Sequence, residues 1–331
     1  MLNLMKALTA PRAISGYEKA ISDKILPLIA PHTDKVWSDA MGNLIAYKKG
    51  TSETPKKIML CAHMDEIGFL VTHVNDNGFI RVTPIGGINP VAAAYTNVTF
   101  GNGVKGIMVL EAGLAPADVK VDKLLVDIGA KDKKEAEKKV KIGDFCALEG
   151  GFTRLLGRRI AGRPLDDRIG CAMLIKIAEK LKEAPCADDV YFVFSVQEEV
   201  GVRGAKTATY AIMPDIGLAY DVTGTGDAVG SKPMACSVGG GAAIKIKDSS
   251  VLCDRELVDE LAAVAKENDI KHQFEILLAG GTDTSSMQMT GAGCRAAALS
   301  VPTRYIHSGV EMLDLSDAEA CVELTVAWLT K

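Results

Sequence analysis

The sequence contains no pair of cysteines spaced Cys-x-x-Cys, and its positive and negative charges are nearly balanced. The eight cysteines are scattered along 331 residues, and Cys61, Cys171 and Cys294 stand inside apolar strings. This distribution predicts buried, reduced thiols and argues against both a disulfide framework and a thiolate metal site. A formal net charge of −4 gives no reason to expect nucleic acid or an anionic membrane as a partner.

Long apolar runs are also absent from the sequence. No stretch approaches the roughly 18–20 apolar residues that a membrane span requires. Residues 1–6 lack the basic region, the apolar stretch and the cleavage site of a secretory signal, and they are typical of an ordinary starting helix. Together with the reduced thiols, these features predict a cytoplasmic protein.

Two common catalytic signatures receive no support. No Gly-x-Ser-x-Gly segment occurs, which argues against a serine hydrolase. Residues 101–106 match the dinucleotide pattern Gly-x-Gly-x-x-Gly, but residues 107–110 predict a following strand where that pattern requires a helix. We therefore interpret Asn102-Gly103 as a hairpin turn.

Helical and strand patterns alternate toward both ends of the chain. This alternation predicts an α/β fold with a mostly parallel sheet flanked by helices. The expected helices cover residues 17–29, 167–181 and the segment from Ser316, the buried strands cover residues 57–63 and 190–196, and a hairpin covers residues 36–49.

The middle of the chain has a different pattern. Between residues 66 and 158 the apolar runs are short and are bounded by turn residues, such as Asn77-Gly78 and Gly86-Gly87. The sequence therefore predicts a small β-rich domain at 66–158, inserted into an α/β domain made of residues 1–65 and 159–331.

Histidine and paired acids follow the predicted strands. His63 ends a buried strand, and Asp65 stands two residues later, where its carboxylate can hold the second ring nitrogen of a metal-binding imidazole. Asp166 and Asp167 precede a predicted helix. An N-cap explains one of these acids, so we interpret Asp166 as a candidate ligand that bridges two ions.

Three further strand ends carry similar groups. Glu198 and Glu199 follow a strongly apolar strand, Asp221 lies at the end of another, and His307 follows the strand that ends near Pro302. Adjacent buried carboxylates are costly unless a cation or proton chemistry uses them. Because ligands of open α/β sheets bind outside the carboxyl ends of the strands, we expect these residues to meet at one edge.

The residue types indicate the chemistry of such a site. Imidazole and carboxylate ligands without thiolate suit Zn²⁺ or a similar divalent ion. Two ions about 3.5–4 Å apart can share a carboxylate, activate water and polarise a substrate carbonyl. A neighbouring carboxylate that is not a ligand can transfer the proton.

In this order, the motifs resemble those of a known family. They resemble the dinuclear metallo-aminopeptidases that form hollow tetrahedral (TET) particles, whose members are named glutamyl or deblocking aminopeptidases and sometimes endoglucanases. The likeness covers essentially the whole chain and implies a zinc-aminopeptidase-like fold. The motifs are His63-x-Asp65, Leu165-Asp166-Asp167-Arg168, Glu198-Glu199, Asp221 and His307.

The resemblance implies a role for each residue. His63 and Asp221 would bind one divalent ion, Glu199 and His307 the other, and Asp166 would bridge them. Glu198 would be the general base, and Asp65 would orient His63. Asp167 is the alternative bridge, and Asp166 is favoured because the family pattern allows Asn at the second position. Thr282 and Asp283 match the family's segment near the active site without an assigned role. Zn²⁺ is the expected metal, with Co²⁺ or Mn²⁺ as alternatives.

The predicted function is the removal of N-terminal residues from short peptides. The alternatives are a glycoside hydrolase of the endoglucanase type and a catalytically inactive assembly protein. A glycosidase needs two carboxylates on either side of one bond, which adjacent Glu198 and Glu199 do not supply. The resemblance also implies that the 66–158 domain pairs subunits into dimers and that six dimers form a dodecamer.

Overall fold

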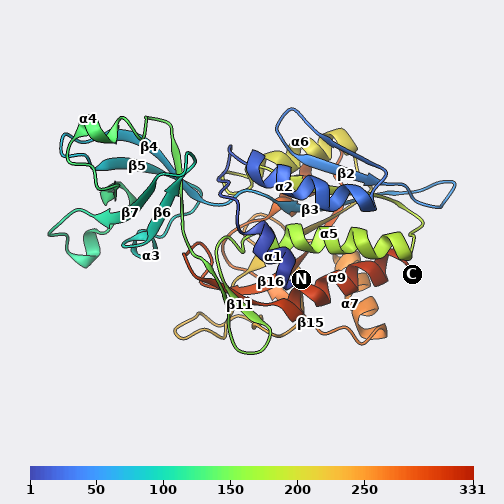
Figure 1. Ribbon diagram of the computed structural model, residues 1–331. Coiled ribbons are helices and arrows are strands. Elements are labelled where there is room, and N and C mark those ends of the chain that lie inside the picture. The colour runs from blue at the N-terminus through green and yellow to red at the C-terminus, as the bar shows by residue number, and fades with distance from the viewer.

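An apolar strand at the centre of the chain's large sheet, β3 (Lys57–His63), organises the fold (Figure 1). The computed structural model describes residues 1–331, apart from the side chain of Pro116. Six of the seven residues of β3 are buried. β3 pairs in parallel with β12 (Asp189–Ser195) on one side and β13 (Ile216–Thr223) on the other, and β13 pairs in parallel with β16 (Arg295–Arg304). Burial on both faces explains the nearly continuous apolar run of β3.

The prediction of a mostly parallel sheet is correct for the centre and wrong for most of the flanks. Four of the ten strand pairings in this eleven-stranded sheet are parallel. Short turns such as 39–43 and 155–158 join neighbouring flank strands, and a short turn can join only antiparallel strands. The flank strands are β1 (Lys35–Ser38), β2 (Leu44–Lys48), β10 (Phe152–Arg154), β11 (Arg159–Gly162), β14 (Ala242–Lys247), β15 (His272–Ile276) and β17 (Glu311–Asp314).

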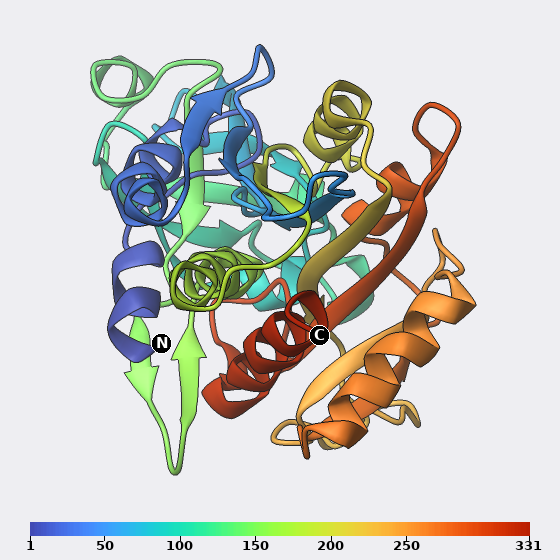
Figure 2. The ribbon, with the colours of Figure 1, turned by 90° about the vertical axis from the view of Figure 1, so that its right-hand side faces the viewer.

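Helices cover both faces of the sheet, as seen along its edge in Figure 2. Side chains alternate between the two faces of a strand, so Leu60 and Ala62 of β3 join one apolar core while Met59 and Cys61 join the other. The first face carries α1 (Leu2–Leu8), α2 (Lys19–Ile29), α5 (Arg168–Glu183), α7 (Arg255–Glu267) and α9 (Leu315–Leu329); the second carries α6 (Arg203–Ile212) and α8 (Asp283–Met289).

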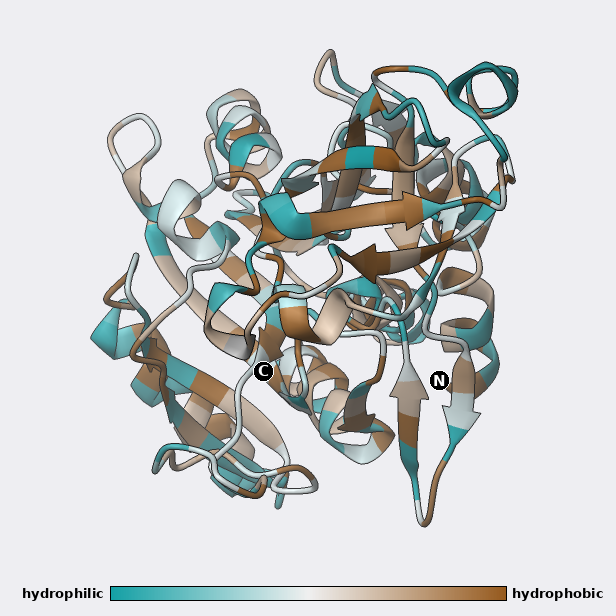
Figure 3. Ribbon diagram, turned by 90° about the vertical axis from the view of Figure 1, so that its left-hand side faces the viewer, coloured by the Kyte–Doolittle hydropathy of each residue, from teal (hydrophilic) through white to brown (hydrophobic). Residues whose placement is uncertain are grey.

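A closed β-barrel forms the second part of the molecule and lies beside the large sheet in Figure 1. Figure 3 shows apolar stretches along its strands and mostly polar connecting segments around them. Its interior is a separate apolar core that includes Phe69, Phe100 and Met108. Its strands are β4 (Gly68–Val74), β5 (Ile80–Ile85), β6 (Asn97–Phe100), β7 (Lys105–Leu110), β8 (Leu124–Asp127) and β9 (Phe145–Leu148), with the short helices α3 (Pro90–Ala93) and α4 (Lys133–Ala136).

The barrel accounts for residues 68–148 of the predicted 66–158 insert, and β10, inside that range, pairs with β11 in the large sheet. The hairpin predicted at Asn102-Gly103 is confirmed, because β6 and β7 pair antiparallel on either side of it.

The cysteine prediction is also confirmed: all eight thiols are free, and all except the partly exposed Cys294 are buried. None of the helices among the described residues has the length and apolar character needed to cross a membrane.

Candidate metal centre

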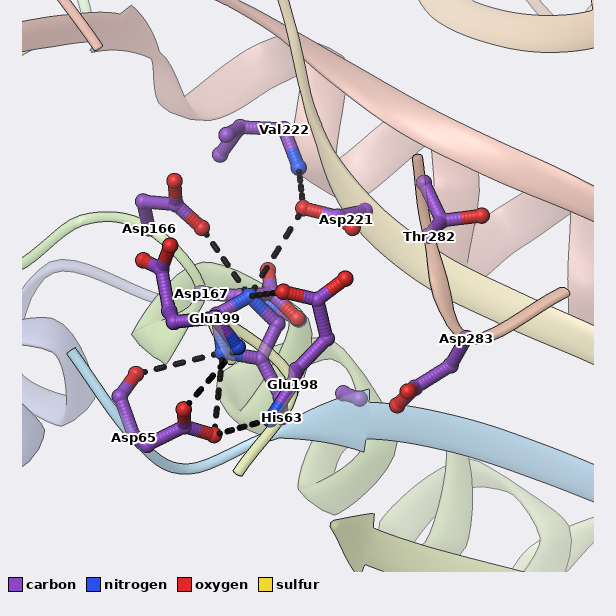
Figure 4. A network of polar contacts seen from close by, with 12 residues as sticks. His63, Asp65, Asp166, Asp167, Glu198, Glu199, Asp221, Val222, Thr282 and Asp283 are labelled. Atoms are coloured by element: carbon purple, nitrogen blue, oxygen red, sulfur yellow. Dashed lines mark hydrogen bonds and ion pairs between the residues drawn. The ribbon is translucent and has the colours of Figure 1, made fainter. Parts of the chain in front are cut away.

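The predicted site residues meet at the carboxyl-terminal edge of the parallel strands (Figure 4). His63 is the last residue of β3, and it lies in register with Ser195, the last residue of β12. Glu198 and Glu199 follow β12, and Asp221 lies near the end of β13. Because these strands run in one direction, segments distant in the chain deliver their polar residues to one place.

Asp166 lies between the two imidazoles. Its Oδ1 is 3.1 Å from Nε2 of His63, and its Oδ2 is 3.2 Å from Nε2 of His307. Nε2 of His63 is also 3.9 Å from Oδ1 of Asp221, and Nε2 of His307 is 3.2 Å from Oε2 of Glu199. Two triads result, His63–Asp166–Asp221 and Asp166–Glu199–His307, and within each the potential ligand atoms lie within 4.8 Å of one another.

Asp167 caps a helix and belongs to neither triad. Its Oδ1 accepts a hydrogen bond of 2.9 Å from the backbone N–H of Gly170, so its side chain caps the first turn of α5. The carboxylate shared by the two triads therefore belongs to Asp166, and that of Asp167 serves the helix.

Asp65 makes more contacts than the sequence indicated. Nδ1 of His63 lies 3.1 Å from the carbonyl oxygen of Asp65 and 3.6 Å from its carboxylate. That carboxylate accepts hydrogen bonds from the backbone N–H groups of Glu198 and Glu199, at 3.0 and 3.1 Å, and from the Ser15 hydroxyl at 2.7 Å. Asp65 therefore fixes the Glu198-Glu199 turn relative to β3 in addition to contacting His63.

Glu198 belongs to neither triad, although it lines the same cavity and its Oε2 lies 3.9 Å from Nε2 of His63. Burial raises the pKa of Glu198 well above its ordinary value; the nearby His63 opposes this shift in part, and the Asp221 carboxylate adds to it. A carboxylate whose pKa is raised in this way is better suited to accept and return a proton near neutral pH.

The donor set fits a divalent cation. Burial, followed by the charge of Asp166, raises the pKa of both Glu199 and Asp221, so ionising these carboxylates together is costly. Burial also opposes protonation of His307, but its contacts with Asp166 and Glu199 outweigh burial and raise its pKa to about 11. No lysine or arginine is among the described residues that line the cavity. A cation would supply the missing positive charge and leave the imidazoles neutral, as ligands must be.

Sequence reasoning missed Glu311, a fully buried residue of β17. Its Oε2 accepts hydrogen bonds from the backbone N–H groups of Leu165 and Asp166, at 2.6 and 3.2 Å. Its Oε1 accepts from the backbone N–H of His307 at 3.2 Å and from the guanidinium of Arg163 at 3.0 Å. One carboxylate thus holds the backbone beside members of both triads. The only signal in the sequence is a lone acid before the apolar pair Met312-Leu313.

Thr282 and Asp283 lie outside both triads. The Thr282 side chain caps α8. Oδ2 of Asp283 accepts hydrogen bonds from the Ser195 hydroxyl at 2.5 Å and the Cys61 thiol at 3.3 Å. Asp283 therefore joins α8 to the ends of β12 and β3, directly behind the site.

A family comparison agrees with this site. The model of the family described as M42 glutamyl aminopeptidase matches residues 42–324. The chain belongs to this family. A protein of Acetivibrio thermocellus is 44% identical to this M42 chain over 327 residues, which cover 98% of the chain and 97% of the relative. The lysyl aminopeptidase of Pyrococcus furiosus is 35% identical over 339 residues, covering 98% of the chain and 96% of the relative.

A solved structure of the same kind is similar over the whole M42 chain. It is the TET1 peptidase of Pyrococcus horikoshii, which can assemble into a tetrahedron or a large octahedral shell. It superposes with a TM-score of 0.89 at 33% identity, covering 100% of this chain and 99% of that one.

The contacts of Glu311 generate the first prediction. Glu311→Gln should remove one of the two carboxylates that pair with Arg163, the other being Glu66 at 3.5 Å, and weaken the hold on Asp166 and His307. Removing one member of a buried ion pair costs about 3–5 kcal/mol, and losing a group that orients metal ligands weakens metal binding about 10–100-fold. Thermal melting and elemental analysis after dialysis measure both effects. The control is Glu319→Gln, which removes a partly exposed partner of Arg158 and should change neither. Equal metal retention by the two variants would contradict the role of Glu311.

Proposed function

We propose that this M42 protein is a two-metal aminopeptidase that removes N-terminal residues from short peptides. The observation that supports this most directly is the pair of triads that share Asp166 inside one cavity, with Glu198 beside them. The cavity has a volume of about 530 Å³, within the usual range for small-molecule sites.

The ligand roles follow the two triads. His63 and Asp221 would hold one divalent ion, Glu199 and His307 the other, and Asp166 both. Zn²⁺ is the expected metal, and Co²⁺ and Mn²⁺ are alternatives for the same N and O donors. Two such ions would polarise the carbonyl of the bond to be cleaved and make water a stronger nucleophile.

Glu198 is the proposed general base. Its carboxylate lies in the cavity, outside both triads, and takes a proton from the attacking water before passing it to the leaving amine. Asp65 supports this transfer because its hydrogen bond to the backbone N–H of Glu198 holds the turn in place. The carboxylates around the site also favour the positively charged amino terminus of a peptide.

The two alternatives fit less well. A glycosidase requires two free carboxyl groups on either side of one bond. Glu199 contacts His307 at 3.2 Å and belongs to a triad. Of this pair, only Glu198 lies outside the triads, so the pair does not supply two free carboxyl groups. An inactive assembly protein has no need to keep both triads together with Glu198.

Metal removal tests the proposal. Chelation should abolish release of N-terminal residues from short peptides, and added Zn²⁺, Co²⁺ or Mn²⁺ should restore it. His63→Ala and His307→Ala should each lower the metal content, because each removes a nitrogen donor from one triad. N-acetylated peptides and cellulose oligomers are the control substrates, and neither should be cleaved. Full activity in a preparation shown by elemental analysis to be metal-free would exclude the mechanism.

A second test separates metal binding from proton transfer. Glu198→Gln should retain the metal and lose roughly 10²- to 10⁴-fold in kcat, the range for general acid–base catalysis. Glu199→Gln, the matched change one residue away, should lose metal because it alters a triad. If both variants have the same metal content, the roles assigned to the two residues are wrong.

The assembly is part of the proposal. We take residues 1–65 and 159–331 as the catalytic domain and residues 66–158 as a dimerisation domain, with six dimers in a dodecamer. Support comes from the assembly of the TET1 relative and from large apolar side chains exposed on the barrel. These are Val91, Tyr95 and Ile107, which are 68%, 73% and 48% exposed. Tyr95 lies beside the strand that carries Ile107, because its backbone N–H donates to the carbonyl of Met108.

Light scattering at micromolar concentration tests this arrangement. The wild type should have the mass of a large homo-oligomer, and Tyr95→Asp should shift it toward smaller species by placing a charge in the interface. Tyr210→Asp is the control, since Tyr210 is 71% exposed on α6, outside the barrel. A monomeric wild type, or identical masses for the two variants, would contradict dimerisation through the barrel.

A further inference from the structure

Most of the cavity wall is uncharged. Of the eighteen residues that line the cavity, six are the members of the two triads together with Glu198, and the other twelve have no ionisable side chain. Four of the twelve are apolar, three carry hydroxyl groups and five are glycines. The apolar residues are Val202, Val222, Leu277 and Ile306.

The three hydroxyl groups already have acceptors within the protein. Thr223 donates to Oε1 of Glu275 at 2.8 Å, Ser250 to Oδ1 of Asp248 at 2.8 Å, and Ser285 to the carbonyl oxygen of Thr282 at 3.0 Å. Each hydroxyl has a single proton to donate. The side chains of this wall therefore offer no hydroxyl donor to a carboxylate on a substrate.

A positive charge does lie behind the wall, but it is neutralised. Lys245 is fully buried, and its ammonium group pairs with Glu275 and, at 3.5 Å, with Asp248. These are the two acids that accept the hydroxyl protons of Thr223 and Ser250. With two carboxylates around one ammonium group, this cluster does not favour a further negative charge in the cavity.

We propose that this site prefers peptides whose N-terminal residue has a neutral, mainly aliphatic side chain, and that it discriminates against acidic and basic ones. The inference rests on the proposed aminopeptidase function and adds a substrate class to it. A buried carboxylate would lose its hydration without gaining a side-chain donor or a cation from the wall. The carboxylates among the described residues that line the cavity belong to the triads and Glu198, which are proposed to bind metal and to transfer the proton. A lysine side chain would therefore have no free carboxylate to pair with. An aliphatic side chain would gain from contact with Leu277 and Val222.

The proposed substrate preference differs from the substrates that the names of related proteins mention. The family model is described by glutamyl substrates, and the Pyrococcus furiosus relative is a lysyl aminopeptidase. Those side chains carry opposite charges, and each would need an oppositely charged or donor-rich wall.

The experiment compares kcat/KM for tripeptides X-Ala-Ala in which the first residue varies in charge at nearly constant shape. Met, Gln, Glu and Lys form a long set, and Leu, Asn and Asp a short one. We expect Leu and Met to exceed Asp, Glu and Lys by about tenfold or more, the scale on which a pocket discriminates by burial and unpaired polar groups. Gln and Asn should fall between, since they are polar but uncharged.

The second part of the experiment places a charge in the cavity wall. Leu277→Lys should raise the ratio of kcat/KM for Glu-Ala-Ala over Leu-Ala-Ala by about tenfold or more, on the same scale. Leu277 is partly exposed, so a long charged side chain can be accommodated there. Leu277→Met is the matched neutral change and should keep the wild-type order of substrates.

The outcomes distinguish a failure of the proposed substrate preference from a failure of the proposed function. Fastest release of Glu, Asp or Lys by the wild type would overturn the neutral preference and leave the aminopeptidase proposal intact. An unchanged Glu-to-Leu ratio in Leu277→Lys would show that this wall does not contact the substrate side chain and would also overturn it. Release of no N-terminal residue from any tripeptide by the metal-loaded enzyme would instead reject the proposed function.

Discussion

The mutual repulsion of four clustered carboxylates is the constraint on which the rest of the site depends. Asp166, Glu198, Glu199 and Asp221 converge with two imidazoles in one cavity. Placing such charges close together away from water is unfavourable unless positive charge offsets them. The fold fixes this arrangement, because three parallel strands end at one edge and deliver four of the six groups from distant parts of the chain.

A second layer of polar residues makes the placement rigid. Glu311 binds backbone N–H groups next to two triad members, and Arg163 balances its charge. Asp65 does the same for the Glu198-Glu199 turn, and Asp283 joins α8 to two strands behind the site. In each case a buried carboxylate accepts several hydrogen bonds at once, which restrains the segments that donate to it.

The uncharged part of the cavity follows a related rule. The hydroxyl groups of Thr223 and Ser250 donate to Glu275 and Asp248, which in turn neutralise the buried Lys245, and the Ser285 hydroxyl donates to the backbone of Thr282. The hydroxyl groups of this wall are thus satisfied inside the protein, and the side chains that remain to face a substrate are mainly apolar. Charge is concentrated at the triads, where the chemistry is proposed, and is absent from the wall proposed to contact the side chain.

The sequence by itself determined which polar residues lie at the ends of the buried strands. His63 and the Glu198-Glu199 pair could be predicted because an apolar run indicates a buried strand, and the polar residues that follow it must lie at the sheet edge. The β-rich character of the middle segment was equally readable from its short runs and turns. Only the tertiary structure decided that Asp166 lies between the imidazoles while Asp167 caps α5, and that Glu311 contacts both sides of the site. It also decided that most flank strands pair antiparallel and that the wall's hydroxyl groups already donate within the protein. Each of these depends on contacts between residues far apart in the chain, and such contacts are set by the packing of whole elements, which local periodicity does not encode.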